Sequence, residues 1–127
     1  MDVLEFREYC LSLPMSEEST PFDENVLVYK IGGKMFAYAD MNDFRRFAVK
    51  CDPDAAGELR ALHPEVLPAH HSDPRHWNDV HTDGSLTDDF LREQILNSYR
   101  LVIMKSVTPK ARRLGILERL RSEGFQI

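Results

Sequence analysis

A chain of 127 residues with 43% hydrophobic and 29% charged residues fits one globular domain with its own core, and this composition excludes a disordered chain. No apolar run approaches the roughly 20 residues of a membrane span, and the acidic start lacks the basic region of a secretory signal, so we expect a cytoplasmic protein. Cys10 and Cys51 lie far apart without CxxC spacing, which argues against a zinc pair or a thioredoxin-like motif.

The net charge of −5 argues against a protein that coats nucleic acid, but the charge is unevenly distributed. Residues 1–24 carry −6 and residues 51–99 carry −7, whereas residues 25–50 carry +3 and residues 100–127 carry +5. A basic face would form if the fold brought the two basic segments together. The cations concerned are Lys30, Lys34, Arg45, Arg46, Lys50, Arg100, Lys105, Lys110, Arg112 and Arg113.

The first half of the chain predicts one helix followed by an antiparallel meander. Asp2 and Glu5 form a capping-box pattern, and apolar residues recur at helical spacing to about Ser12. Three apolar, β-branched and aromatic runs follow, and Gly32-Gly33 predicts a tight hairpin turn between the first two. The predicted strands are Val26–Ile31, Lys34–Asp40 and Arg46–Lys50.

The second half predicts three helices and two short edge-type strands. A helix begins at Asp52-Pro53 and stops at His63-Pro64, a longer one follows a Thr87 cap, and a basic one follows Thr108-Pro109. The predicted short strands are Val66 to about Ala69 and Trp77 to about His81. This order describes an α+β domain, with an antiparallel sheet of about five strands and helices packed on one face.

The predicted hairpin is apolar on both faces. One face must pack on the helices, and the other is either covered by the C-terminal segment or left as a surface for a partner. Pairing across a two-residue turn places Leu27, Tyr29, Ile31, Phe36 and Tyr38 on one face, and Val26, Val28, Met35, Ala37 and Ala39 on the other.

Three motifs carry a resemblance to a known family: Gly32-Gly33-Lys34-Met35-Phe36-Ala37, Lys50-Cys51-Asp52-Pro53, and the run from His70 to Val80 with His76-Trp77-Asn78. In this order and spacing the chain resembles the MmcQ/YjbR-like family of small bacterial proteins. The resemblance implies a frataxin-like (CyaY-like) fold with a double-wing DNA-binding motif. It covers roughly residues 1–112 of a single domain, with a less typical basic helical extension over residues 109–127.

Lys30 and Lys34 flank the predicted turn. A basic hairpin can contact the phosphates of DNA, although lysines at a hairpin end also serve to prevent pairing with the edge of another sheet. Under the resemblance, these lysines with Arg45 and Arg46 neutralise phosphates. Arg75 and Asn78 then form the second wing, with Arg75 on phosphate and Asn78 on a base edge. The lone Trp77 either stacks on a base or fills a seam in the core, and we expect the core position. The alternative for Asn78 is a structural role, in which it holds a turn or bridges strands.

Five histidines fall between positions 63 and 81, and imidazole is a common metal ligand. However, strand alternation separates His76 from His81, and no HExxH or paired-Cys spacing organises a ligand set. No Ser, Cys or Thr stands in a nucleophile turn. We therefore expect no catalytic activity, no metal and no cofactor. The remaining histidines are His63, His70 and His71.

The basic tail from Lys110 to Arg121 predicts an amphipathic helix that binds nucleic acid, an acidic partner, or the acidic first helix of its own chain, which we favour. Our hypothesis is a non-catalytic protein that binds double-stranded DNA weakly, with strong salt dependence, through basic hairpins. The alternative is a protein–protein adaptor or homodimer that uses the second sheet face or the tail. A third, less favoured, is a metal-binding protein that uses the histidines.

Overall fold

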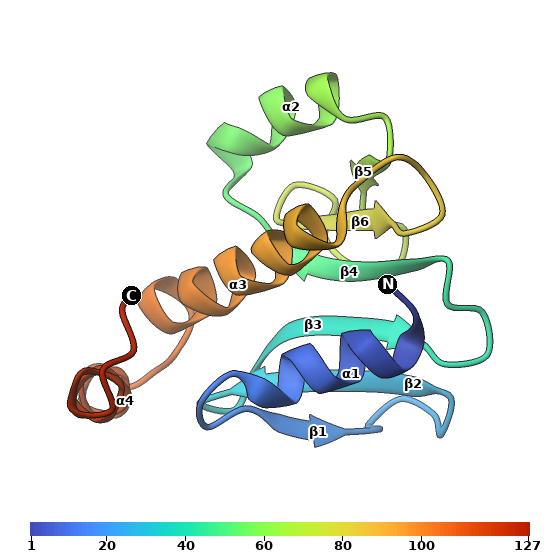
Figure 1. Cartoon of the computed structure of the whole chain (residues 1–127). Helices are drawn as coiled ribbons and strands as arrows, with labels where there is room; N and C mark the ends of the chain where they lie inside the picture. Colours follow the sequence, from blue (N-terminus) through green and yellow to red (C-terminus); the bar gives the residue numbers. More distant parts are fainter.

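The computed structural model describes residues 1–127 as four helices and one six-stranded antiparallel sheet with strand order β1-β2-β3-β4-β6-β5 (Figure 1). None of the helices combines the length and the hydropathy that a membrane span requires. In chain order the elements are α1 (Val3–Ser12), β1 (Glu17–Ser19), β2 (Val26–Ile31), β3 (Lys34–Asp40), β4 (Arg46–Lys50), α2 (Pro53–Leu62), β5 (Val66–Pro68), β6 (Trp77–His81), α3 (Asp88–Lys105) and α4 (Lys110–Ser122).

The N-terminal caps predicted for the first three helices are confirmed. The Asp2 carboxylate accepts the Glu5 N–H at 2.9 Å, Asp52 accepts the Asp54 N–H at 2.9 Å, and Thr87 accepts the Phe90 N–H at 3.1 Å. The prediction for α4 was wrong by one residue. Pro109 itself is the extended N-cap of α4, so Thr108 lies outside the helix and no side chain caps it.

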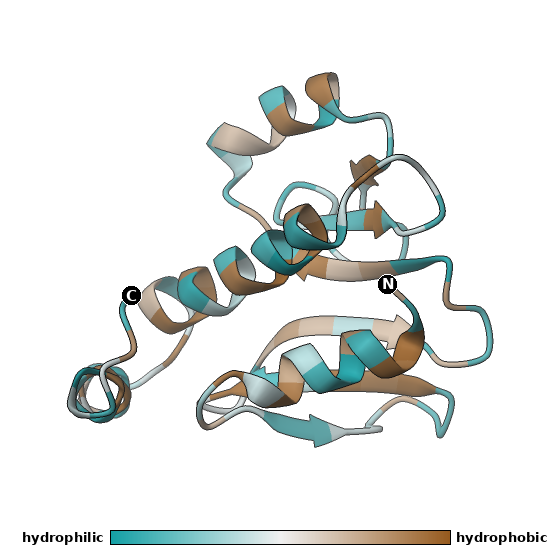
Figure 2. Cartoon of the chain, in the orientation of Figure 1, coloured by the Kyte–Doolittle hydropathy of each residue, from teal (hydrophilic) through white to brown (hydrophobic).

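The helices cover one face of the sheet, as predicted. α1 and α3 cross the same face, and α4 lies at the end of the β2–β3 hairpin (Figure 1). The strands behind α1 and α3 are largely hydrophobic (Figure 2). Phe6 of α1 lies 5.2 Å from Phe47 and 5.6 Å from Tyr29 between ring centroids, and Phe36 lies 5.4 Å from Tyr99 of α3. These aromatic contacts anchor the core.

A β-bulge at Phe36 corrects the predicted pairing of the hairpin. Lys30 pairs with Met35, but the next pair is Tyr29 with Ala37, so Phe36 has no partner across the strand. Beyond this point the two faces of β3 exchange, because side chains alternate along a strand. Ala37 and Ala39 therefore enter the main core, and Tyr38 lies on the outer face against Trp77.

β1 was not predicted, because its sequence is short and polar. Its position is fixed by Glu18, whose carboxylate accepts hydrogen bonds at 2.8 Å from both Arg7 Nε and the Tyr29 hydroxyl. Burial opposes ionisation of Glu18, but the hydrogen bonds from Arg7 and Tyr29 outweigh it and lower the pKa of Glu18. Burial, followed by the bond to Glu18, raises the pKa of Tyr29.

The C-terminal segment is an integral part of the domain. Ile116 and Leu120 of α4 belong to the same hydrophobic core as Phe6 and Phe36. The tail thus packs within its own chain, as favoured from the sequence. The contacts that place it are with α3 and the hairpin turn, instead of the predicted acidic face of α1, and they include a 2.9 Å hydrogen bond from Arg113 to the Met104 carbonyl.

Candidate functional site

Two loops leave the sheet at the same end. β4 ends at Lys50 and β6 begins at Trp77, and these two residues face each other in the ladder. The Cys51 N–H extends the pairing by donating to the His76 carbonyl at 2.8 Å. β3 begins at this end as well, because Ala37 pairs with Val49. The Gly32-Gly33 turn and the loop over residues 69–76 therefore project from one end of the sheet.

The junction of α3 and α4 lies beside the Gly32-Gly33 turn. Arg112 Nη1 donates to the Gly32 carbonyl at 3.4 Å, and Lys50 Nζ donates to the Ser106 hydroxyl at 2.7 Å. Gly32 and Gly33 adopt φ values of +58° and +80°, as the predicted tight turn requires. The basic C-terminal segment thus meets the basic hairpin, which the uneven charge distribution allowed but did not establish.

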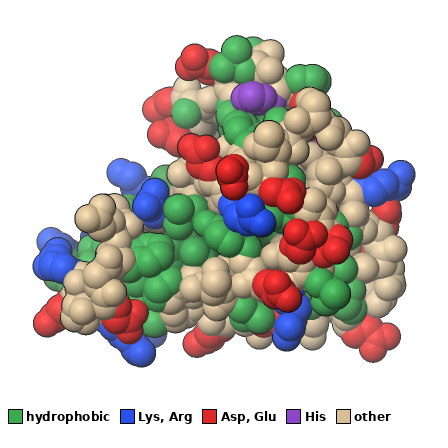
Figure 3. All heavy atoms as spheres, viewed as in Figure 1, with side chains coloured by type: hydrophobic (Ala, Val, Ile, Leu, Met, Phe, Trp, Pro, Cys, Tyr) green, Lys and Arg blue, Asp and Glu red, His purple; other side chains and the backbone are tan.

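We call the resulting group of cations the basic end of the molecule. None of its members has a carboxylate oxygen within 4.0 Å. Figure 3 shows Lys and Arg side chains around α4, whereas Asp and Glu side chains gather over α2 and the start of α3. The basic end consists of Lys30, Lys34, Lys50, Arg75, Lys105, Lys110, Arg112 and Arg113.

The start of α4 adds to the positive potential of the basic end. No side chain caps this helix, and its first turn contains no acidic residue. The first N–H groups of a helix lack intrahelical acceptors and carry the positive end of the helix dipole. Lys110 and Arg112 therefore lie beside backbone amides that favour an anion. A phosphate group at this position would accept hydrogen bonds from the free amides and attract the two cationic side chains.

Arg45 and Arg46 do not belong to the basic end. They lie at the opposite end of β4, about 15 Å away for a strand of this length. Arg45 forms a 2.9 Å ion pair with Asp43, and Arg46 Nε lies 3.7 Å from Asp79. The Arg45 hydrogen bond lowers the pKa of the Asp43 carboxyl. The structure thus separates these two arginines from the lysines with which they were grouped.

Asn78 has a structural role that replaces the base contact predicted for it. Its side chain is 1% exposed, and its Oδ1 accepts a hydrogen bond from Arg60 Nε at 2.9 Å. Arg60 Nη2 also donates to the Pro74 carbonyl at 2.6 Å, which holds the second loop. Trp77 is 9% exposed and packs with Ala48 and Tyr38 in a small hydrophobic cluster on the outer face, so the expected buried position is confirmed, outside the main core.

The histidines do not converge. His63 stacks on Phe90 with ring centroids 4.5 Å apart, His70 and His71 lie beside each other, and His81 Nδ1 lies 4.0 Å from Asp83. No group of three or more His, Cys, Asp or Glu side chains is close enough to hold a metal ion.

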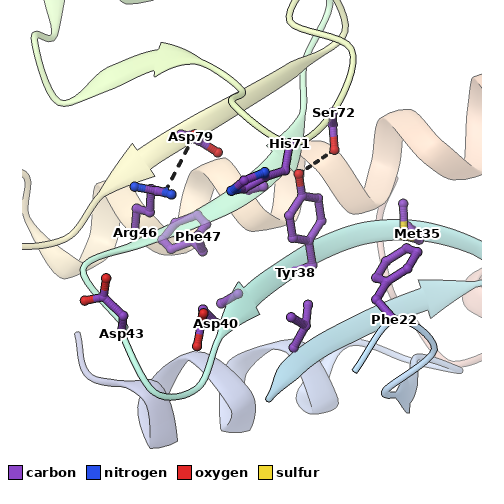
Figure 4. Close-up of a pocket in the computed structure, with 13 residues that line it drawn as sticks. Phe22, Met35, Tyr38, Asp40, Asp43, Arg46, Phe47, His71, Ser72 and Asp79 are labelled. Carbon is purple, nitrogen blue, oxygen red and sulfur yellow. Dashed lines mark hydrogen bonds and ion pairs between the residues drawn. The ribbon is translucent and has the colours of Figure 1, made fainter. Parts of the chain in front are cut away.

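The outer face of the sheet contains a cavity of about 430 Å³. Figure 4 shows Arg46 and Asp79 toward one end of this cavity and Phe22 and Met35 toward the other, with Tyr38 between them. The loop over residues 69–76 covers part of the face through His71 and Ser72, and the Ser72 hydroxyl contacts the Tyr38 hydroxyl. The second face is therefore not covered by the C-terminal segment. Sequence reasoning missed the cavity because it placed Tyr38 on the same face as Tyr29 and Phe36, whereas the bulge turns it to the opposite face.

Comparison with known proteins gives relatives of the same size. The chain is 29% identical to the uncharacterized protein YjbR of Escherichia coli K12 over 104 residues, which is 81% of this chain and 88% of YjbR. It is also 29% identical to the uncharacterized protein YbdF of Escherichia coli O157:H7 over 98 residues, which is 76% of this chain and 80% of YbdF.

Two solved structures share the fold. The crystal structure of Deinococcus radiodurans protein DR2400, a DUF419 domain, superposes with a TM-score of 0.81 at 36% identity, covering 90% of this chain and 86% of that protein. A Pseudomonas syringae protein superposes with a TM-score of 0.68 at 22% identity, covering 80% of this chain and 98% of that one. The YjbR family model matches residues 11–101, which excludes α4. The chain belongs to the YjbR family of uncharacterised proteins.

Proposed function

We propose that this protein is a non-catalytic DNA-binding protein that contacts the phosphates of a duplex through its basic end. The observation that carries the proposal is the set of eight cations without ion-pair partners at one end of a chain whose net charge is −5. Unpaired cations gathered on one surface of an acidic protein favour a polyanion as partner.

Three carboxylates lie near the basic end without an oxygen within 4.0 Å of its cations. One is Glu17, which stands opposite Lys30 in the β1–β2 ladder. Asp52 accepts the Asp54 N–H at the start of α2, and Asp73 accepts the Arg75 N–H within the second loop. Both carboxylates are thus committed to backbone groups. Five of the eight cations are exposed to solvent: Lys34, Arg75, Lys105, Lys110 and Arg112.

The arrangement supports two wings with a helix start beside one of them. Lys34 at the first loop and Arg75 at the second would each meet a phosphate, and the N-terminus of α4 would receive a third beside Arg112. Phosphate contacts position a protein without reading the base sequence, so we expect little sequence preference. The affinity is weak and falls steeply with salt, because few cations are involved and the remaining surface is acidic.

The test is a fluorescence-anisotropy titration of a labelled duplex at several salt concentrations. We compare the double variant Lys34→Ala/Arg112→Ala with Arg45→Ala/Arg92→Ala, which removes the same charge away from the basic end. The first pair should weaken binding and flatten the slope of log affinity against log salt by about 2. The second pair should leave both nearly unchanged. Equal effects of the two pairs, or no binding at low salt, would overturn the proposal.

A further inference from the structure

We propose that the cavity on the outer sheet face binds a small organic cation with an apolar body, such as an aromatic amine. This site is separate from the basic end and does not depend on the proposed DNA binding. It rests on one buried carboxylate with an uncommitted oxygen, on the sign of the surrounding charge, and on the apolar wall opposite.

The buried carboxylate is Asp79, which is 7% exposed. Its Oδ2 accepts the His70 N–H at 3.0 Å and lies 3.7 Å from Arg46 Nε. Both contacts use the same oxygen, and Oδ1 is neither hydrogen-bonded nor sealed from solvent. A buried carboxylate is costly unless its oxygens find donors, and Asp79 lines the cavity, so its free Oδ1 is an acceptor for a ligand.

The charge around the cavity selects a cation over an anion. Asp40, Asp43 and Asp79 line it with one guanidinium, that of Arg46, and one imidazole, that of His71. Arg45 pairs with Asp43 from outside and Arg46 lies 3.7 Å from Asp79, which leaves the Asp40 carboxylate as the excess negative charge. An ammonium or amidinium group would complement this excess, whereas a carboxylate or phosphate ligand would be repelled.

The other end of the cavity supplies an apolar wall. Phe22 projects there from the loop before β2 and is 66% exposed, and Met35 and Tyr38 rise from β3 beside it (Figure 4). Aromatic faces attract cations as well as apolar groups. The volume of about 430 Å³ lies within the range of small-molecule sites, roughly 300–1,000 Å³. A cationic head beside Asp79 and an aromatic body beside Phe22 would occupy the two ends.

The effect of ligand charge can be tested with three ligands of nearly equal size and shape: benzylamine, benzyl alcohol and benzoate. Trp77 is the only Trp, and its ring lies 5.7 Å from that of Tyr38, so its single indole N–H signal in NMR spectra reports on the cavity. Benzylamine should give a saturable shift of this signal and of the backbone signals of Tyr38 and Asp79. Benzyl alcohol should bind at least several-fold more weakly, and benzoate should give no saturable shift.

Two variants test the two ends of the site. Asp79→Asn should weaken benzylamine binding by about tenfold, since it removes a charge-assisted hydrogen bond while keeping an acceptor for the His70 N–H. Phe22→Ala, at an exposed side chain, should weaken it without risk to folding. Asp89→Asn removes the same charge at a side chain that is 98% exposed and should change nothing. Equal binding of all three ligands, no saturable shift, or unchanged binding in both cavity variants would overturn the proposal.

Discussion

The Ser98 hydroxyl donates a hydrogen bond of 2.6 Å to the carbonyl of Phe36, the bulged residue of β3. The same hydroxyl accepts the Lys50 N–H of β4 at 2.8 Å. β3 and β4 pair directly at only two positions, Ala37 with Val49 and Tyr38 with Ala48. Ser98 therefore bridges β3 and β4 just beyond their last direct pair, and it ties α3 to the end of the sheet that presents the two loops.

Replacement of Ser98 by Ala should reduce the free energy of unfolding by about 2–4 kcal/mol, because it leaves two backbone groups without partners at a fully buried position. Chemical denaturation measures the change. Ser12 offers the control, since its hydroxyl bonds a carbonyl at an exposed helix end. Ser12→Ala should change the stability by no more than about 0.5 kcal/mol. Similar losses in the two variants would contradict the bridging role of Ser98.

The two glycines of the β2–β3 turn should differ in their tolerance of a side chain. Both have positive φ, so alanine at either position costs about 1–2 kcal/mol of backbone strain. At Gly32 the new Cβ would also lie 2.9 Å from two methyl carbons of Val107 and 3.0 Å from Ile116, whereas at Gly33 the nearest atom is Arg112 Nη1 at 3.6 Å. Thermal unfolding should show a larger loss for Gly32→Ala, by about 1–3 kcal/mol more than for Gly33→Ala. A reversed order would contradict the close packing of α4 on this turn.

The Glu18 carboxylate should contribute to stability in a pH-dependent manner. Its pKa in the folded protein lies below the ordinary value of 4.5. The contribution is therefore fully present above pH 4.5 and is lost as the pH falls through the lower folded-state pKa. The difference in unfolding free energy between the protein and Glu18→Gln should be constant near neutral pH and shrink in acid. Urea denaturation at a series of pH values measures it, and a difference that grows toward low pH would have the wrong sign.

The sequence predicted the helices and most strands because local signals agree with the tertiary structure. Asp2, Asp52 and Thr87 form the caps that their positions indicated, and Gly32-Gly33 forms the turn. β1 escaped prediction because its residues have no strand pattern of their own, and its position depends on Glu18 meeting Arg7 and Tyr29 from other elements.

The candidate site was predictable only in part, because charge alone does not place residues in space. Lys30, Lys34 and Arg75 lie at one end of the molecule, whereas Arg45 is close to them only in the order of the chain. The register of the paired strands decides which of these cations lie close together, and the register depends on contacts between residues far apart in the chain. The choice between a base contact and a structural role for Asn78 depends on its partner Arg60, eighteen positions away, which the sequence did not indicate.

The bulge at Phe36 makes the core and the outer cavity depend on the same single residue. Because one extra residue exchanges the faces of β3, deletion of a residue here would turn Tyr38 inward and Ala37 outward. Among relatives, an insertion or deletion at this point would therefore alter the shape of the cavity and the packing of the core together. Alignment gaps at this position would mark proteins whose outer face differs from the one described for this chain, even where the order of helices and strands is the same.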